Sequence, residues 1–153
     1  HMMPEWLPAY CENQAVNAIL SYYAQIAEKA GTALEIQAQM EKEIPVPEPE
    51  FCVLLGNLLE NAVDACRENN ESGAIKVHIR QTGTSLIAIT VDNPCRNPPV
   101  LEGKRFLSTK HSGPGIGTQS IRLIAERHHG DARFEWKNGM FYASVILIPS
   151  AES

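Results

Sequence analysis

The sequence predicts an α+β fold, a two-layer sandwich in which helices cover one face of a mixed, mostly antiparallel sheet. Two observations predict it. Segments with apolar residues at helical spacing are separated by segments in which apolar and polar residues alternate. Short turn sequences join two pairs of the alternating segments as hairpins, so most neighbouring strands should run antiparallel.

The first half of the chain contains a helix, a strand and a second helix. Apolar residues recur at helical spacing from about Asn13 to Ala30, and Gly31 is well placed to end this helix. Alternation over residues 34–40 indicates a half-buried strand. Three prolines between residues 45 and 49 make a stiff connector. The second helix is expected from Glu50 to about Glu68.

The second half begins with two strands, continues through a long irregular segment and a helix, and ends with two more strands. The expected ranges are 75–79 and 86–91 for the first two strands, about 93–115 for the irregular segment, about 116–129 for the helix, and 132–137 and 140–148 for the last strands. Asn138-Gly139 is the strongest short hairpin signal available. An irregular segment as long as 93–115 is uncommon inside a domain and usually functional.

Length and composition indicate one domain, residues 3–153. Residues 1–2 resemble a cloning remnant, so we expect the chain to be a piece of something larger. The net charge of -5 and the lack of a basic stripe argue against nucleic-acid binding. No apolar run approaches the ~20 residues of a membrane span, so direct membrane contact is not expected. Four cysteines without a CxxC pair favour reduced thiols and a cytoplasmic location.

The second helix carries the first candidate site. Asn57 and Asn61 stack one turn apart, and Glu60 and Asp64 stack on the neighbouring strip, while apolar residues cover the opposite side. Asn is a poor helix-interior residue because its short amide competes for backbone hydrogen bonds. Two of them in adjacent turns suggest that the amides have a ligand. The alternative is a solvated helix face.

A glycine-rich stretch directly before the third helix is the second candidate. Gly113, Gly115 and Gly117 allow the backbone to approach a ligand closely, and the start of the helix offers unpaired N–H groups to a phosphate. Lys110 adds a positive charge and Thr118 a hydroxyl. The alternative is a flexible loop that only caps the helix.

The end of the second strand in this half is the third candidate. If Ile89 and Val91 face the core, the alternation places Asn93 inward and Asp92 outward. An inward polar group at a strand end is suited to forming hydrogen bonds with the edge of a nucleotide base. The alternative is a simple turn at Asp92-Asn93-Pro94.

Together, the three segments resemble the ATP-binding domain shared by gyrase, Hsp90-type chaperones, sensor histidine kinases and mismatch-repair proteins, the GHKL group. The helix with Asn57 and Asn61 resembles its N box, Asp92-Asn93 stands at its adenine-binding aspartate box, and residues 113–117 resemble its glycine box. The resemblance covers about residues 11–149 and implies the Bergerat ATP-binding fold.

The branch most similar to this chain is that of the sensor kinases, including the bacterial peptide-quorum-sensing kinases. The segments that carry this resemblance are residues 12–20, 56–62 and 108–110, and Gly115-Ile116-Gly117. The resemblance implies ATP and Mg²⁺ as cofactors. The ATP-binding residues that it implies are Asn57, Asn61, Asp64, Asp92, Asn93, Lys110, Gly113, Gly115, Ile116, Gly117 and Thr118.

The same resemblance implies individual roles. Asn61 would coordinate the Mg²⁺ that bridges the phosphates, and Asn57 would assist through metal or phosphate contacts. Lys110 and the amides of the glycine box would hold the phosphates, which makes Asn57, Asn61 and Lys110 the catalytic set. Asn93, or alternatively Asp92, would meet the adenine amino group.

Two departures from the family pattern stand out. The aspartate box usually reads DxGxG, but here Pro94, Cys95 and Arg96 follow Asn93 without a glycine. In addition, Asn57 stands where ATP-hydrolysing members carry a glutamate general base. The lack of that base favours transfer of phosphate to a partner over hydrolysis.

The resemblance therefore implies the catalytic domain of a sensor histidine kinase, which transfers the γ-phosphate of ATP to a histidine on a separate dimerisation domain upstream. A response regulator would be the next partner, and the whole protein would be a membrane-anchored sensor with this domain in the cytoplasm. Two alternatives stay open. One is a serine kinase of the anti-sigma type, and the other is a non-catalytic nucleotide-binding scaffold.

Overall fold

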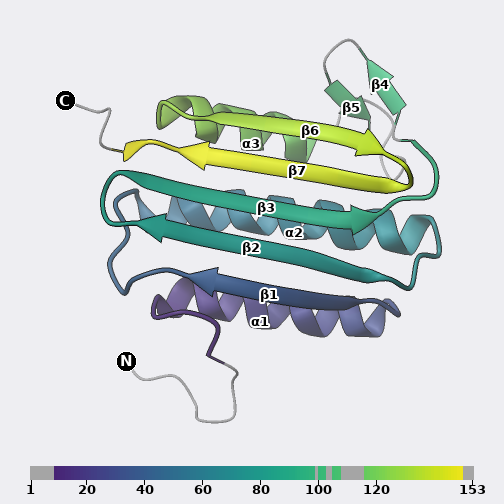
Figure 1. Ribbon diagram of the computed structural model, residues 1–153, viewed down its shortest axis with the longest axis horizontal. Coiled ribbons are helices and arrows are strands. Elements are labelled where there is room, and N and C mark those ends of the chain that lie inside the picture. The colour runs from purple at the N-terminus through teal and green to yellow at the C-terminus, as the bar shows by residue number, and fades with distance from the viewer. Residues whose placement is uncertain (1–8, 99, 103–104, 108–115, 150–153) are drawn as a thin grey trace.

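The computed structural model describes residues 9–98, 100–102, 105–107 and 116–149. Figure 1 shows two layers, a five-stranded sheet with three helices behind it. The helices cover one face of the sheet, and the other face carries no helix in the described part of the chain. The predicted α+β sandwich is therefore confirmed.

The described elements follow the predicted order. Their bounds are α1 (Gln14–Lys29), β1 (Ala33–Gln39), α2 (Glu48–Glu68), β2 (Ala74–Thr82), β3 (Leu86–Pro94), β4 (Val100–Glu102), β5 (Arg105–Leu107), α3 (Ile116–Arg127), β6 (Asp131–Lys137) and β7 (Met140–Leu147).

Most bounds differ from the expected ones by a few residues, and three differences have a clear physical reason. Helix α2 begins at Glu48, before Pro49, because a proline is tolerated in the first turn, where its missing N–H has no helical acceptor. Helix α3 ends at Arg127, and His129 has a left-handed φ of 58°. The segment expected to be irregular contains the β4–β5 pair, whose strands of three residues are too short for alternation to be recognised.

The sheet order is β1-β2-β3-β7-β6, and only β1 and β2 run parallel among these pairs. A parallel pair needs a long crossover, which α2 supplies between these two strands. The β6–β7 hairpin turns at Asn138 and Gly139, whose φ angles of 50° and 80° confirm the turn that the dipeptide predicts. The mixed, mostly antiparallel sheet is as expected.

The core lies between the sheet and the helices, with α2 at its centre. Five large side chains of α2 are fully or almost fully buried: Phe51, Leu54, Leu55, Leu58 and Leu59. They pack in one cluster with the inward residues of β2, β3 and β7. Among the described residues, no helix combines the length and the apolar character that crossing a membrane requires.

Candidate nucleotide-binding site

Helices α2 and α3 lie side by side behind the sheet and run in opposite directions (Figure 1). The end of α3 is fixed at the start of α2, because Arg127 Nη1 lies 2.8 Å and His128 Nε2 3.0 Å from Glu50 Oε1. At about 1.5 Å per residue, α3 extends about 18 Å, and Asn61 lies about 16 Å beyond Glu50 along α2. The start of α3 is therefore at about the level of Asn61.

The polar face of α2 has the arrangement that the sequence predicts. Asn57, Asn61 and Asp64 are half-buried, whereas the apolar side is buried. Within the described part of the chain, neither Asn57 nor Asn61 has a hydrogen bond to its side-chain amide. The Asp64 carboxylate lies 3.4 Å from Arg67 Nη1. Two carboxamides one turn apart are therefore available to a ligand.

Glu60 faces away from this pair of amides. Its Oε2 atom lies 3.4 Å from the hydroxyl of Tyr23 on α1, and α1 and α3 lie on opposite sides of α2 (Figure 1). Burial raises the pKa of Tyr23 to about 12, and the nearby Glu60 carboxylate adds to the shift. This contact directs the carboxylate toward α1, so Glu60 is poorly placed to act as a base beside Asn61.

Strand β3 directs its last polar residues to opposite faces. Asn93 is 2% exposed and belongs to the inward row of the strand, whereas Asp92 is half-buried and belongs to the outward row. Burial raises the pKa of Asp92, while His78 and Lys76 oppose the shift. The Asn93 Nδ2 atom donates to Pro94 O at 2.9 Å, which leaves Oδ1 as an acceptor. The inward position of Asn93 agrees with the prediction.

The end of β3 lies beside the second half of α2. Cys66 Sγ donates to Pro94 O at 3.8 Å, and α2 packs against β3. In Figure 1, β3 ends at the same side of the molecule at which α2 ends and α3 begins. The structure therefore brings the asparagine pair, the strand end and the start of α3 to one side.

The glycine box is described only at its end. Ile116 and Gly117 are the first two residues of α3, and Thr118 is buried. Lys110, Gly113 and Gly115 lie outside the described residues. The first turn of a helix presents backbone N–H groups that suit a phosphate.

The residues fit a Mg²⁺–nucleotide better than a bare metal ion. Among the described residues, no group of three or more His, Cys, Asp or Glu side chains could hold a metal alone. Carboxamide oxygens suit Mg²⁺, which keeps waters and commonly takes other ligands from substrate phosphates. Asn57 and Asn61 supply such oxygens, and Asn61 lies at about the level of the start of α3.

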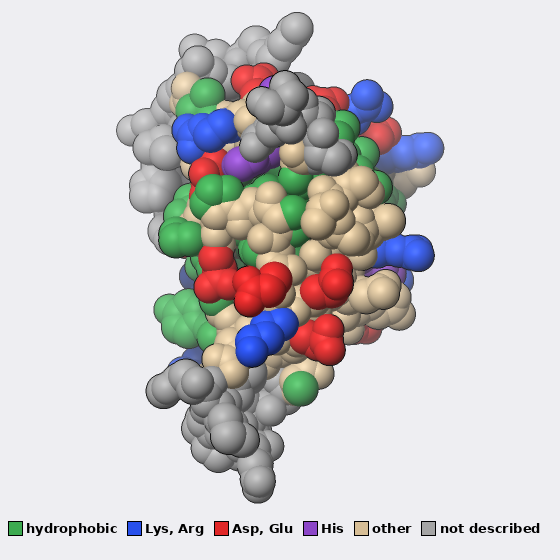
Figure 2. Space-filling view, turned by 90° about the vertical axis from the view of Figure 1, so that its left-hand side faces the viewer, with side chains coloured by type: hydrophobic (Ala, Val, Ile, Leu, Met, Phe, Trp, Pro, Cys, Tyr) green, Lys and Arg blue, Asp and Glu red, His purple; other side chains and the backbone are tan. Residues whose placement is uncertain are grey.

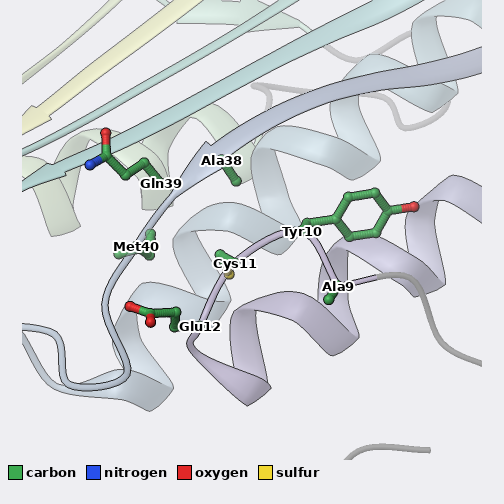
Figure 3. Close-up of a pocket in the computed structure, with 7 residues that line it drawn as sticks. All are labelled: Ala9, Tyr10, Cys11, Glu12, Ala38, Gln39 and Met40. Carbon is green, nitrogen blue, oxygen red and sulfur yellow. The ribbon is translucent and has the colours of Figure 1, made fainter. Parts of the chain in front are cut away.

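Two other surfaces differ from this site. Figure 2 shows the opposite end of the molecule, where Asp and Glu side chains gather and would repel phosphates. A cavity of about 370 Å³ lies between the N-terminal segment and the end of β1 (Figure 3). Its lining residues are Ala9, Tyr10, Cys11, Glu12, Ala38, Gln39 and Met40. None of the predicted site residues lines this cavity.

The sequence pattern does not indicate which residues bind the segment that follows β3, residues 95–97. Asn69, Glu71 and Trp136 bind residues 95–97 from two sides. These contacts join parts of the chain that are 25 or more residues apart. No spacing or motif indicates them in advance.

Similarity to known proteins agrees with the expected function. The chain is 27% identical to the probable C4-dicarboxylate sensor kinase of Bacillus subtilis (strain 168), over 95% of this chain and 29% of that protein. It is also 27% identical to the sensor histidine kinase ZraS of Salmonella typhi, over 93% of this chain and 32% of that protein. The chain thus spans about a third of the length of these curated relatives.

Solved structures show the same fold. The catalytic domain of the histidine kinase ThkA has a TM-score of 0.69 at 20% identity, covering 90% of this chain and 93% of that chain. The mycobacterial sensor histidine kinase MprB has a TM-score of 0.65 at 13% identity, covering 88% and 93%.

A family model described as the GHKL domain matches residues 48–149. This region contains α2, β3 and the start of α3, which carry the candidate site. Together with the sensor kinase relatives, the match supports the predicted role as the ATP-binding catalytic domain of a sensor histidine kinase. Because the matched region makes up most of the chain, the protein belongs to the GHKL domain family.

Proposed function

We propose that this chain binds Mg²⁺–ATP where α2, β3 and the start of α3 meet, and transfers the γ-phosphate to a histidine on another domain of the full-length protein. One observation carries the proposal. Asn57 and Asn61 place two carboxamides without described partners on a half-buried helix face, and Asn61 lies at about the level of the start of α3.

The two asparagines are the proposed metal residues. Asn61 Oδ1 binds Mg²⁺, and Asn57 supports the metal or a phosphate from the preceding turn. When bound, the ion offsets charge on the phosphates during transfer. The half-buried setting strengthens this effect, because charges interact more strongly where water is partly excluded. Asp64, one turn beyond Asn61, borders the same face.

The proposed phosphate-binding part is the start of α3. The N–H groups around Ile116, Gly117 and Thr118 point out of the first helical turn and suit the anionic phosphates. Lys110, Gly113 and Gly115 join this set through the family resemblance, with Lys110 as a positive charge for the γ-phosphate. Phosphoryl transfer needs mainly such positioning and charge stabilisation from a protein.

Asn93 is the proposed adenine residue. Its Oδ1 atom accepts from the adenine amino group, because its Nδ2 atom is already bound to Pro94 O. Asp92 is the alternative, but its side chain belongs to the outer row of the sheet.

The site favours transfer over hydrolysis. Asn57 replaces the glutamate base of the hydrolysing members, and the Glu60 carboxylate is bound to Tyr23 on the other side of α2. Glu60 is therefore not oriented to activate a water near the γ-phosphate.

The partners follow from the family. The acceptor histidine lies on a dimerisation domain upstream, and a response regulator receives the phosphate next. The described histidines do not suit the acceptor role: His128 is buried beside Glu50, His78 lies within β2, and His129 follows the end of α3. We place the domain on the cytoplasmic side of a membrane-anchored sensor.

Calorimetric titration tests the proposal. ADP and a non-hydrolysable ATP analogue are titrated, with and without Mg²⁺, into the wild-type chain, Asn61→Ala and Gln25→Ala. The last variant is the matched control, because it removes an exposed carboxamide from α1. We expect Mg²⁺-dependent binding that weakens at least about tenfold in Asn61→Ala, the loss of one good metal or charge-assisted contact.

Three results would contradict the proposal. Equal binding by the wild type and Asn61→Ala would remove Asn61 from the site. No binding at protein concentrations that detect a ~1 mM complex, about -4 kcal/mol, would favour a non-catalytic scaffold. Transfer of label from ATP to a serine of a partner would favour the anti-sigma-type kinase.

A further inference from the structure

The chain segment that follows β3 is bound to the β6–β7 hairpin. The Cys95 N–H donates to Gly139 O at 2.8 Å, and the Cys95 carbonyl accepts from Trp136 Nε1 at 2.7 Å. Both backbone polar groups of Cys95 therefore have partners in the same hairpin. The side chain of Cys95 is also buried, at 4% exposure.

The same segment is bound on its other side to the end of α2. Asn97 Nδ2 donates to Asn69 Oδ1 at 3.1 Å, and Asn69 caps the helix by donating to Ala65 O at 2.8 Å. The Arg96 N–H donates to Glu71 Oε2 at 2.7 Å, and the Arg96 guanidinium lies 3.7 Å from the same oxygen. Three successive residues are thus held between α2 and the hairpin.

We call this set of contacts the Cys95 clamp. Its members are Asn69, Glu71, Cys95, Arg96, Asn97, Trp136 and Gly139. Cys95 links the two sides, since its Sγ donates to Asn97 O at 3.0 Å and accepts from Asn69 Nδ2 at 3.9 Å. In the family resemblance given above, Cys95 and Asn97 stand at the two glycine positions of the DxGxG pattern.

Pro94 lies between the clamp and Asn93 and is itself closely confined. Its ring approaches Gly73 so closely that a Cβ there would lie 3.0 Å from Pro94 Cγ. The proline ring also fixes φ. Its carbonyl accepts from Asn93 Nδ2 at 2.9 Å and from Cys66 Sγ at 3.8 Å. The position of this carbonyl decides which end of the Asn93 amide remains free.

The choice of amide end matters because a carboxamide can rotate and exchange donor for acceptor. With Nδ2 bound to Pro94 O, Oδ1 is free to accept from the amino group at C6 of adenine. A rotated amide would instead offer Nδ2 to the C6 carbonyl of hypoxanthine or guanine. A carboxylate, the usual residue of the family, accepts in either orientation and needs no such control.

We propose that the Cys95 clamp sets the adenine preference of the site by fixing Pro94 O and, through it, the orientation of the Asn93 amide. Trp136 and Asn97 are positioning residues in this account, since neither needs to touch the nucleotide. The proposal rests on the proposed function, because it assumes that Asn93 faces the base.

The test compares ADP with inosine diphosphate (IDP), which differs at C6, in Mg²⁺ buffer. The variants are Trp136→Phe, which removes the N–H donor and keeps a ring, and Asn97→Ala, which changes an exposed side chain. Tyr142→Phe is the matched control, because it removes a polar group from an outward aromatic residue of the same hairpin. Thermal unfolding without nucleotide checks that each variant folds.

We expect the wild type and Tyr142→Phe to bind ADP at least about tenfold more tightly than IDP. With ADP, Asn93 Oδ1 accepts a hydrogen bond from the adenine amino group, whereas with IDP the same oxygen faces the C6 carbonyl and is repelled by it. In Trp136→Phe and Asn97→Ala the preference should fall to about threefold or less, with weaker ADP binding and unchanged or stronger IDP binding. A merely structural clamp would weaken both nucleotides equally, and that result would overturn the proposal.

A second measurement needs no nucleotide. In ¹H–¹⁵N NMR spectra of the free chain, the side-chain amide signals of Asn93 should shift in Trp136→Phe and Asn97→Ala but not in Tyr142→Phe. Unchanged Asn93 signals would overturn the clamp even if nucleotides bind. If the Asn93 signals shift but the chain binds neither ADP nor IDP, the clamp does orient the Asn93 amide. That result would overturn only the proposed function.

Discussion

His128 Nε2 lies 3.0 Å from Glu50 Oε1, and this contact joins the end of α3 to the first turn of α2. Arg127 binds the same carboxylate oxygen at 2.8 Å. The side chain of His128 is 7% exposed and that of Glu50 is 19% exposed, so the contact is largely shielded from water. It fixes where α3 starts relative to Asn61 in the second half of α2.

Replacing Glu50 should therefore weaken the α2–α3 contact. We expect Glu50→Gln to lower the free energy of unfolding by about 1 kcal/mol, since a charged acceptor is lost while the size of the side chain is kept. The Arg127 side chain is 63% exposed and contributes little of this. Urea unfolding measures the change. Glu126→Gln, at an exposed site of α3, should change stability by less than about 0.5 kcal/mol, and equal effects would show that the Glu50 contact is not stabilising.

Gly130 allows the chain after α3 to pass close to β7. A Cβ at this position would lie 1.6 Å from Ile146 O and 2.6 Å from Ile146 C, which are backbone atoms that cannot rotate away. We expect Gly130→Ala to destabilise the fold by about 3 kcal/mol or more.

Gly56 offers the matched comparison. It lies inside α2, and the nearest atom to an added Cβ there would be Tyr23 Oη at 4.0 Å. Gly56→Ala should stabilise the fold by about 0.5–1 kcal/mol, because alanine loses less backbone entropy in a helix. Thermal and urea unfolding of both variants decide the point. Similar effects of the two substitutions would contradict the packing argument.

The fold could be predicted because its signals are local. Helical and alternating periodicity marks most elements, and Asn138-Gly139 specifies its hairpin by its own φ angles. The inward position of Asn93 follows from the period of two along β3. Such patterns lie within a few residues of one another, so tertiary contacts are not needed to read them.

Other features depend on contacts between distant residues and could not be predicted. The start of α2 is one case: Glu48 accepts from Asn13 Nδ2 at 2.9 Å, across from the start of α1. The Cys95 clamp is another, because Trp136 and Asn69 act on Cys95 from different elements. From the sequence alone, Trp136 is recognisable only as one inward residue of a strand, and Asn69 only as part of a turn.

The raised pKa of Tyr23 predicts a pH-dependent stability. Burial, followed by the Glu60 carboxylate, raises this pKa to about 12, against about 10 in an unfolded chain. Between these values the unfolded chain releases the phenol proton and the folded chain keeps it, so stability falls as the pH rises. The Tyr23 contribution is fully present below about pH 10 and is lost as the pH rises through about 12.

Tyr23→Phe should therefore make the alkaline loss of stability shallower between about pH 10 and 12. Urea unfolding across this range measures the slope. Tyr22→Phe is the matched control, because Tyr22 is the neighbouring phenol and is 59% exposed. Burial also raises the pKa of the Cys66 thiol, to about 11, but this group is common to all three proteins. Identical slopes in the wild type and Tyr23→Phe would contradict the assignment.

The side chains of Asp92 and Asn93 lie on opposite faces of the sheet, so replacing them should affect adenine binding differently. Asn93 is inward and 2% exposed, whereas Asp92 pairs across the sheet with Lys76 and Tyr142 in the outward row. We expect Asn93→Ala to weaken ADP binding about tenfold, through the lost hydrogen bond to the adenine amino group. Asp92→Asn should leave the dissociation constant within about twofold, because its side chain does not face the site. Titration of ADP into both variants distinguishes them, and a greater loss in Asp92→Asn would assign the base to Asp92 and contradict the role of Asn93.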